Sequence, residues 1–131
     1  MRISADICEH ISHNRDDGTI DVLRLGIPGF AVPSIPAQLK FHILVRILLD
    51  GDESRPPALI VSILDPTGSR VLQPTVVPLD QPTKQPAART VLIADIDMKL
   101  QVKTVGKFTA EIEVVNSDPI LLYFTLMEKA E

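Results

Sequence analysis

The amino-acid sequence predicts an all-β domain, a two-layer sandwich of about seven to nine antiparallel strands with little or no helix. Three observations predict this fold. Apolar residues recur at every second position through much of the chain, which is the period of a strand with one buried face. Clusters of Asp, Asn, Gly and Pro separate these stretches at the short intervals typical of sandwiches. No stretch combines helical apolar spacing with capping residues.

The first half of the chain contains five expected strands, at 2–11, 19–26, 39–49, 58–65 and 69–73. The clearest pattern runs from Leu39 to Leu49, where the odd positions are apolar and the even positions include Lys40 and His42. The turns between strands contain Asp, which forms local side-chain hydrogen bonds, and Gly, which adopts positive φ. These stretches are therefore interpreted as half-buried strands joined by tight turns.

The second half contains three further expected strands, at 92–102, 108–114 and 120–127. The first two have one apolar and one polar face, whereas the last is apolar on both. In that last strand Leu121, Tyr123 and Met127 face away from Leu122 and Phe124. We expect one face of this strand to meet a partner or to be covered by another part of the chain.

The inward-facing positions of these patterns predict the residues that fill the space between the two layers. They are Leu39, Phe41, Ile43, Val45, Ile47, Leu92, Ile96, Met98, Leu100, Phe108, Ile112, Val114, Leu122 and Phe124.

Two segments interrupt the alternation. Residues 26–36 form an apolar, proline-containing stretch that is expected to be a loop, because proline cannot donate to a strand ladder. Pro74, Pro78, Pro82 and Pro86 recur every four residues, a spacing that does not align on one face of a three-per-turn polyproline helix. We interpret the second segment as an extended crossover between the layers.

Length and charge restrict the class of protein. The chain has 131 residues without a linker-like break, so we expect one domain spanning 1–131. The net charge is −4 and basic residues do not cluster, which disfavours nucleic acid. Apolar stretches fall far short of the roughly 20 residues of a membrane helix. An early acidic residue, Asp6, and a single cysteine predict a cytoplasmic protein without a secretory signal or an internal disulfide.

Cys8, His10 and His13 form the only sequence-local group of metal-capable residues. A zinc site needs three or four ligands at defined spacing, and this group has no second cluster to complete it. A Cys–His nucleophile pair would also need a pocket that neighbours on an open strand lack. We therefore expect solvated histidines, with no metal and no catalytic role.

Asp95 and Asp97 are paired carboxylates that strand geometry places roughly 7 Å apart on one face. Inverting glycosidases separate their acid and base by a similar distance. Because these residues alternate with an apolar face, we expect both to point into solvent. Nucleotide-binding and hydrolase motifs are also missing, and the few aromatic residues disfavour a sugar or other small-molecule ligand, so the sequence predicts neither enzyme nor cofactor.

Four stretches carry a family resemblance, namely Ala5-Asp6, 17–23, 63–71 and 105–112. Their order resembles an uncharacterised bacterial family of immunoglobulin-like β-sandwich domains and, more loosely, the macroglobulin-type sandwich modules. In such sandwiches a D-P-x-G turn, here Asp65–Gly68, joins two paired strands. A G-x-F pattern, here Gly106–Phe108, opens the penultimate strand. The resemblance implies an immunoglobulin-like fold and no functional residues.

These observations lead to the hypothesis of a non-catalytic interaction or scaffold subunit that acts with a larger bacterial protein or assembly. A self-assembling homo-oligomer is the first alternative, since open strand edges can also pair between copies. A metal-dependent or hydrolytic enzyme using Cys8, His10 and His13 or the Asp95/Asp97 pair is the second. The contact residues expected from the apolar segment and the last strand are Ile27, Phe30, Val32, Ile35, Leu121, Tyr123 and Met127.

Overall fold

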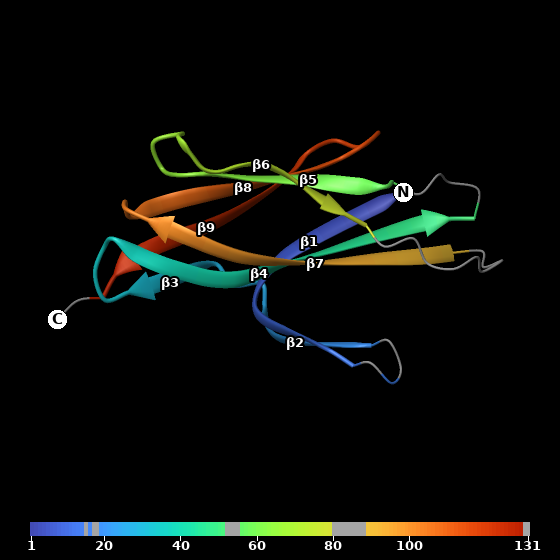
Figure 1. Ribbon diagram of the computed structural model, residues 1–131, viewed down its shortest axis with the longest axis horizontal. Coiled ribbons are helices and arrows are strands. Elements are labelled where there is room, and N and C mark those ends of the chain that lie inside the picture. The colour runs from blue at the N-terminus through green and yellow to red at the C-terminus, as the bar shows by residue number, and fades with distance from the viewer. Residues whose placement is uncertain (15, 17–18, 52–55, 80–88, 130–131) are drawn as a thin grey trace.

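A computed structural model describes residues 1–14, 16, 19–51, 56–79 and 89–129. These residues form nine strands and no helix, in two packed sheets, which confirms the β-sandwich (Figure 1). The strands are β1 (Arg2–His13), β2 (Ile20–Leu25), β3 (Gly29–Val32), β4 (Ala37–Asp50), β5 (Ala58–Leu64), β6 (Arg70–Pro78), β7 (Arg89–Val102), β8 (Gly106–Val114) and β9 (Ile120–Glu128).

The first sheet has the order β2-β1-β4-β7 and the second the order β3-β9-β8-β5-β6. Every pair is antiparallel except β3 with β9, which is parallel, so the expectation of wholly antiparallel strands is wrong at this position. The chain leaves the edge of the first sheet at Gly26, where φ is 80°, and enters the edge of the second. The direction in which the chain crosses between the sheets sets the direction of β3, and β3 therefore runs parallel to β9.

Strand β3 lies inside the segment that the sequence predicts to be a loop. Its four residues fall between Pro28 and Pro33, and proline-free stretches of this length are long enough for a short edge strand. Strand β6 also extends beyond its expected end and includes Pro74 and Pro78. It is an edge strand, where a missing N–H is tolerated, so this part of the crossover is a strand. Pro82 and Pro86 lie outside the described residues.

The space between the sheets is filled by the alternating apolar residues. All predicted core residues are buried except Leu122, which is half-buried and packs against the others. The four phenylalanines of the chain form one connected group: the ring of Phe124 lies 5.2 Å from Phe108, 5.3 Å from Phe41 and 5.6 Å from Phe30. Since Phe30 belongs to β3, this group fixes the crossover segment to both sheets.

The β1–β2 hairpin projects from the body of the sandwich (Figure 1). It encloses a second, smaller apolar cluster of Cys8, Ile11 and Leu44, against which Ile20 and Val22 pack. Leu44 occupies an even position of β4, on the outer face of the first sheet, yet it is only 5% exposed. Its burial shows that the hairpin covers part of this outer face.

The turn between β5 and β6 is organised by Asp65, as its sequence predicts. One carboxylate oxygen, Oδ1, accepts hydrogen bonds from the Thr67 hydroxyl at 2.6 Å, the Thr67 amide at 2.9 Å and the Ser69 amide at 3.0 Å. These donors favour the ionised form, the Thr67 hydroxyl most, and lower the pKa of Asp65.

Candidate functional site

Cys8 on β1 is fully buried within the hairpin cluster, so the expectation that it lies on an open strand face is wrong. Its thiol lies 3.7 Å from the backbone carbonyl oxygen of His42, which accepts a weak hydrogen bond. Burial, together with the negative charges of Asp95 and Asp6, raises the pKa of Cys8 to about 11. The thiol is therefore protonated at neutral pH, unlike the thiolate that a nucleophile or a metal ligand requires.

A carboxylate links the hairpin to the far edge of the first sheet. The Asp95 carboxylate on β7 accepts a hydrogen bond from His42 Nδ1 on β4 at 2.7 Å and lies 2.9 Å from His13 Nε2 on β1. His10 adds an edge-to-face contact with His42, their ring centroids 5.5 Å apart. All three histidines of the chain thus lie in one network around Asp95, which we call the His–Asp cluster (His10, His13, His42 and Asp95).

The His–Asp cluster contains residues from two groups that are separate in the sequence, the Cys8/His10/His13 group and the Asp95/Asp97 pair. The side chain of Asp95 is only 17% exposed, so the expectation that it points into solvent is wrong, whereas Asp97 is exposed as expected. His10 and His13 are exposed, also as expected. His42 is not among the site residues predicted from the sequence. Its only sequence signal is its place on a strand whose partner, β7, carries the carboxylates.

The arrangement of the His–Asp cluster gives it a structural role. Its hydrogen bonds connect three strands, and the buried thiol beneath it is protonated. Within the described part of the chain, no group of three or more His, Cys, Asp or Glu side chains is arranged to hold a metal ion. The cluster therefore holds the hairpin against the outer face of the first sheet.

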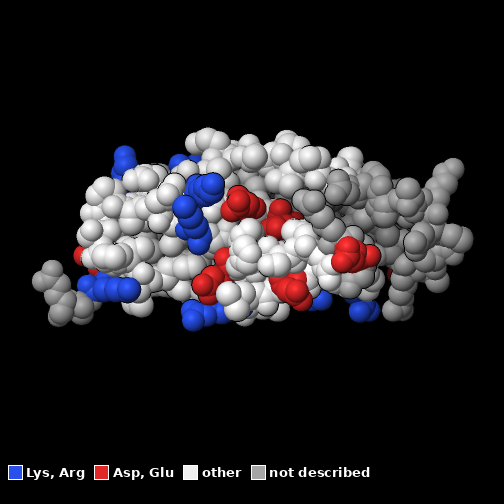
Figure 2. Space-filling view, turned by 60° about the horizontal axis from the view of Figure 1, so that its bottom comes forward, with Lys and Arg blue, Asp and Glu red and all other residues white. Residues whose placement is uncertain are grey.

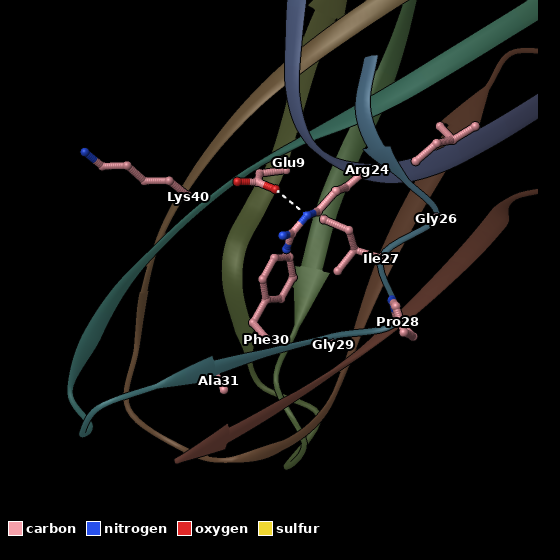
Figure 3. Close-up of a pocket in the computed structure, with 10 residues that line it drawn as sticks. Glu9, Arg24, Gly26, Ile27, Pro28, Gly29, Phe30, Ala31 and Lys40 are labelled. Carbon is pink, nitrogen blue, oxygen red and sulfur yellow. Dashed lines mark ion pairs between the residues drawn. The ribbon is translucent and has the colours of Figure 1, made fainter. Parts of the chain in front are cut away.

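A hollow of about 700 Å³ opens where the chain crosses from β2 to β3 (Figure 3). We call it the corner hollow; it is lined by Glu9, Lys40 and the residues from Arg24 to Ala31. Figure 3 shows the Glu9–Arg24 ion pair above Ile27 and Phe30, whereas Lys40 extends away. Arg24 Nε lies 3.1 Å from Glu9 Oε2, so the charge within the hollow is balanced. The rest of the hollow is lined largely by apolar side chains and backbone atoms.

The backbone of β3 contributes a free edge to the corner hollow. The Pro28 carbonyl accepts a hydrogen bond from the Thr125 amide of β9 at 3.0 Å, and the Val32 carbonyl accepts one from the Lys129 amide just after β9 at 2.8 Å. Backbone groups alternate in direction along a strand, so Phe30 also faces β9 while Gly29 and Ala31 face the opposite way. No strand pairs with this side of β3 in the described chain. The N–H and C=O groups of Gly29 and Ala31 thus form an open edge, which we call the β3 edge.

Gly29 has a second role at this position. A Cβ built there would lie 2.7 Å from the backbone oxygen of Thr125 on β9. Only glycine lets β3 approach β9 this closely, and the approach places the β3 edge beside the hollow.

The contact residues predicted from the apolar segment have different environments. Ile27, Phe30 and Ile35 are half-buried and pack against the core, and the first two line the corner hollow. Val32 is 7% exposed and belongs to the core, so its prediction as a contact residue is wrong. It was placed on the surface because the segment was expected to be a loop, whereas strand alternation turns Val32 inward.

The last strand presents its second apolar row to solvent, as alternation predicts. Leu121, Tyr123 and Met127 are each about half exposed, at 46%, 49% and 56%. Lys107 Nζ lies 4.1 Å from the centroid of the Tyr123 ring, in a cation–π contact. Glu111 on β8 lies opposite Leu121. This row is therefore bordered by charged side chains.

Charge is unevenly distributed on the side from which the hairpin projects. Figure 2 shows acidic side chains gathered in the middle of this side, with basic side chains next to them. Two basic residues on the outer face of the first sheet, Lys40 and Lys99, lie opposite each other in the β4–β7 register and are both exposed. Neither has an ion pair within the described residues, and Lys40 lines the corner hollow.

None of the described residues belongs to a helix long and apolar enough to cross a membrane. Comparison with known protein families finds none that matches this chain, and comparison with curated proteins finds no match either.

Proposed function

We propose that this protein is a non-catalytic interaction domain that binds another protein through the corner hollow and the residues around it. The observation that carries the proposal is a partly apolar hollow of about 700 Å³ beside a strand edge that is unpaired in the described chain. Monomeric proteins usually cover or charge such edges, because an open one pairs with other chains. Leu25, which lines the hollow, is 57% exposed, although burial of a leucine side chain is worth about 2 kcal/mol.

The chemistry of Cys8 supports the non-catalytic part of the proposal. A nucleophilic cysteine needs a lowered pKa, whereas the pKa of Cys8 is raised to about 11. The proposal also takes an immunoglobulin-like domain of bacterial origin from the sequence resemblance, and a cytoplasmic location from the early Asp6 and the single cysteine. The partner in the proposal is a different protein, and pairing between two copies is the alternative.

Site-directed photo-crosslinking in the cells of origin tests the proposal. A photoreactive phenylalanine derivative replaces Leu25 in the hollow, and the control carries it at Val115, which is exposed to a similar extent, 62%, in the β8–β9 turn. We expect one protein to crosslink from position 25 and not from position 115, and Ile27→Asp in the same chain to abolish the product. A product formed equally from both positions, or from neither, would contradict the proposal. A product of twice the chain mass would identify a second copy as the partner.

A further inference from the structure

The β3 edge restricts what can occupy the corner hollow. We propose that the partner contributes an extended peptide segment with an acidic side chain, which adds to the second sheet as a strand beside β3. This inference rests on the proposed function and specifies the chemistry of its partner.

The backbone groups of the β3 edge determine the conformation of the segment. Gly29 and Ala31 together offer two N–H donors and two C=O acceptors, spaced as in a strand and without partners in the described chain. Only another extended backbone presents donors and acceptors at this spacing, which is the basis of recognition by strand addition. An apolar small molecule or a folded surface would leave these polar groups without hydrogen-bonding partners.

Both ends of the β3 edge are closed, which limits the length of the pairing. On one side, the next outward-facing amide, that of Ile27, already donates to the carbonyl of Ile7 at 3.0 Å. On the other side, the next outward position is Pro33, which has no N–H. The paired region is therefore centred on Gly29–Ala31, and a bound segment needs only about three to five residues in register.

The side chains around the β3 edge specify the composition of the segment. Leu25, Ile27 and Phe30 provide apolar contacts within the hollow. Glu9 neutralises Arg24, whereas Lys40 lines the hollow and lies opposite Lys99 with no carboxylate partner in the described chain. Like charges at opposite positions destabilise a strand pair. A carboxylate on the incoming segment would relieve this repulsion, so the partner is expected to combine an apolar with an acidic residue.

A phage-displayed library of random peptides about twelve residues long provides the probe. The full-length protein is the bait, and the most enriched peptides are synthesised for measurement of dissociation constants. Ala31→Pro removes the outward N–H and places a ring in the path of the added strand, whereas Ala31→Ser is the matched control that keeps the amide. We expect enriched acidic–apolar peptides, unchanged binding to Ala31→Ser and binding at least about tenfold weaker to Ala31→Pro.

Two further measurements keep the inference testable if Ala31→Pro fails to fold. Lys40→Glu changes an exposed residue on another strand and should weaken binding about fivefold, in line with one exposed ion pair. Hydrogen exchange of the wild-type protein should show the Gly29 and Ala31 amides slowed by peptide. Absence of enriched peptides, equal binding to Ala31→Pro, or unchanged exchange at Ala31 would each overturn strand addition. A crosslink from position 25 in any of these cases would leave the interaction function intact.

Discussion

Replacing Asp95 with alanine should loosen the β1–β2 hairpin. The carboxylate joins β7 to β4 through His42 and to β1 through His13, so its loss removes both side-chain links between these strands. The matched control is Asp97→Ala, on the same strand and the same face but exposed.

The expected loss of stability follows from the exposure of the three side chains. Asp95 and His42 are only 17% and 15% exposed, so loss of the carboxylate leaves the His42 Nδ1 group with little water, at a cost of about 1.5 kcal/mol. His13 is 59% exposed, and its link contributes about 0.5 kcal/mol. Together the substitution should lower the free energy of unfolding by about 2 kcal/mol, and Asp97→Ala by less than about 0.5 kcal/mol.

Urea unfolding of the two variants measures this difference, and a double-mutant cycle with His13→Ala isolates the hairpin link. Because Asp95 contributes to the raised pKa of Cys8, the pKa of this thiol should also fall in Asp95→Ala. Equal stability of Asp95→Ala and Asp97→Ala, with an unchanged thiol pKa, would show that the His–Asp cluster does not hold the hairpin.

Three further predictions follow from individual positions. The pKa of Cys8 is about 11 in the folded protein and 9.0 ordinarily, so the thiol ionises at lower pH in the unfolded state. The free energy of unfolding should therefore fall between about pH 9 and 11. Urea titrations of Cys8→Ala should show no such fall. Gly29→Ala should cost about 1–3 kcal/mol in thermal unfolding, since its Cβ would meet the Thr125 oxygen at 2.7 Å, and a neutral effect would contradict the close approach of β3 to β9. Ile43→Ala and Ile112→Ala remove fully buried side chains and should each cost about 2–5 kcal/mol, whereas losses below about 1 kcal/mol would mean a wrongly placed core.

Alternation predicted the sandwich well where a strand has one buried face. The patterns in β4, β7 and β8 identified the buried face of each of these strands, because side chains along a strand alternate with a period of two. Strand β3 was missed because it has only four residues between two prolines, too few for a period to emerge. With β3 read as a loop, the inward orientation of Val32 could not be predicted.

The His–Asp cluster could not be predicted because it depends on strand order. His13 and Asp95 are 82 residues apart, and His42 and Asp95 are 53 apart. Periodicity assigns each residue to a face but does not say which strands are neighbours or that a hairpin folds over the outer face. The corner hollow itself was not predicted: the sequence indicated Ile27 and Phe30 as contact residues of the apolar segment, while the polar residues that line the hollow come from β1, β2 and β4.

The open β3 edge is the central claim of this account, and amide hydrogen exchange of the isolated protein tests it most directly. The Phe30 amide faces β9 and the Ala31 amide faces the corner hollow, so these adjacent amides should differ. We expect exchange at Ala31 to be at least about a hundredfold faster than at Phe30 and to be independent of protein concentration. Protection of Ala31 equal to that of Phe30 in dilute solution would mean that another part of the chain covers the edge, and would contradict the account.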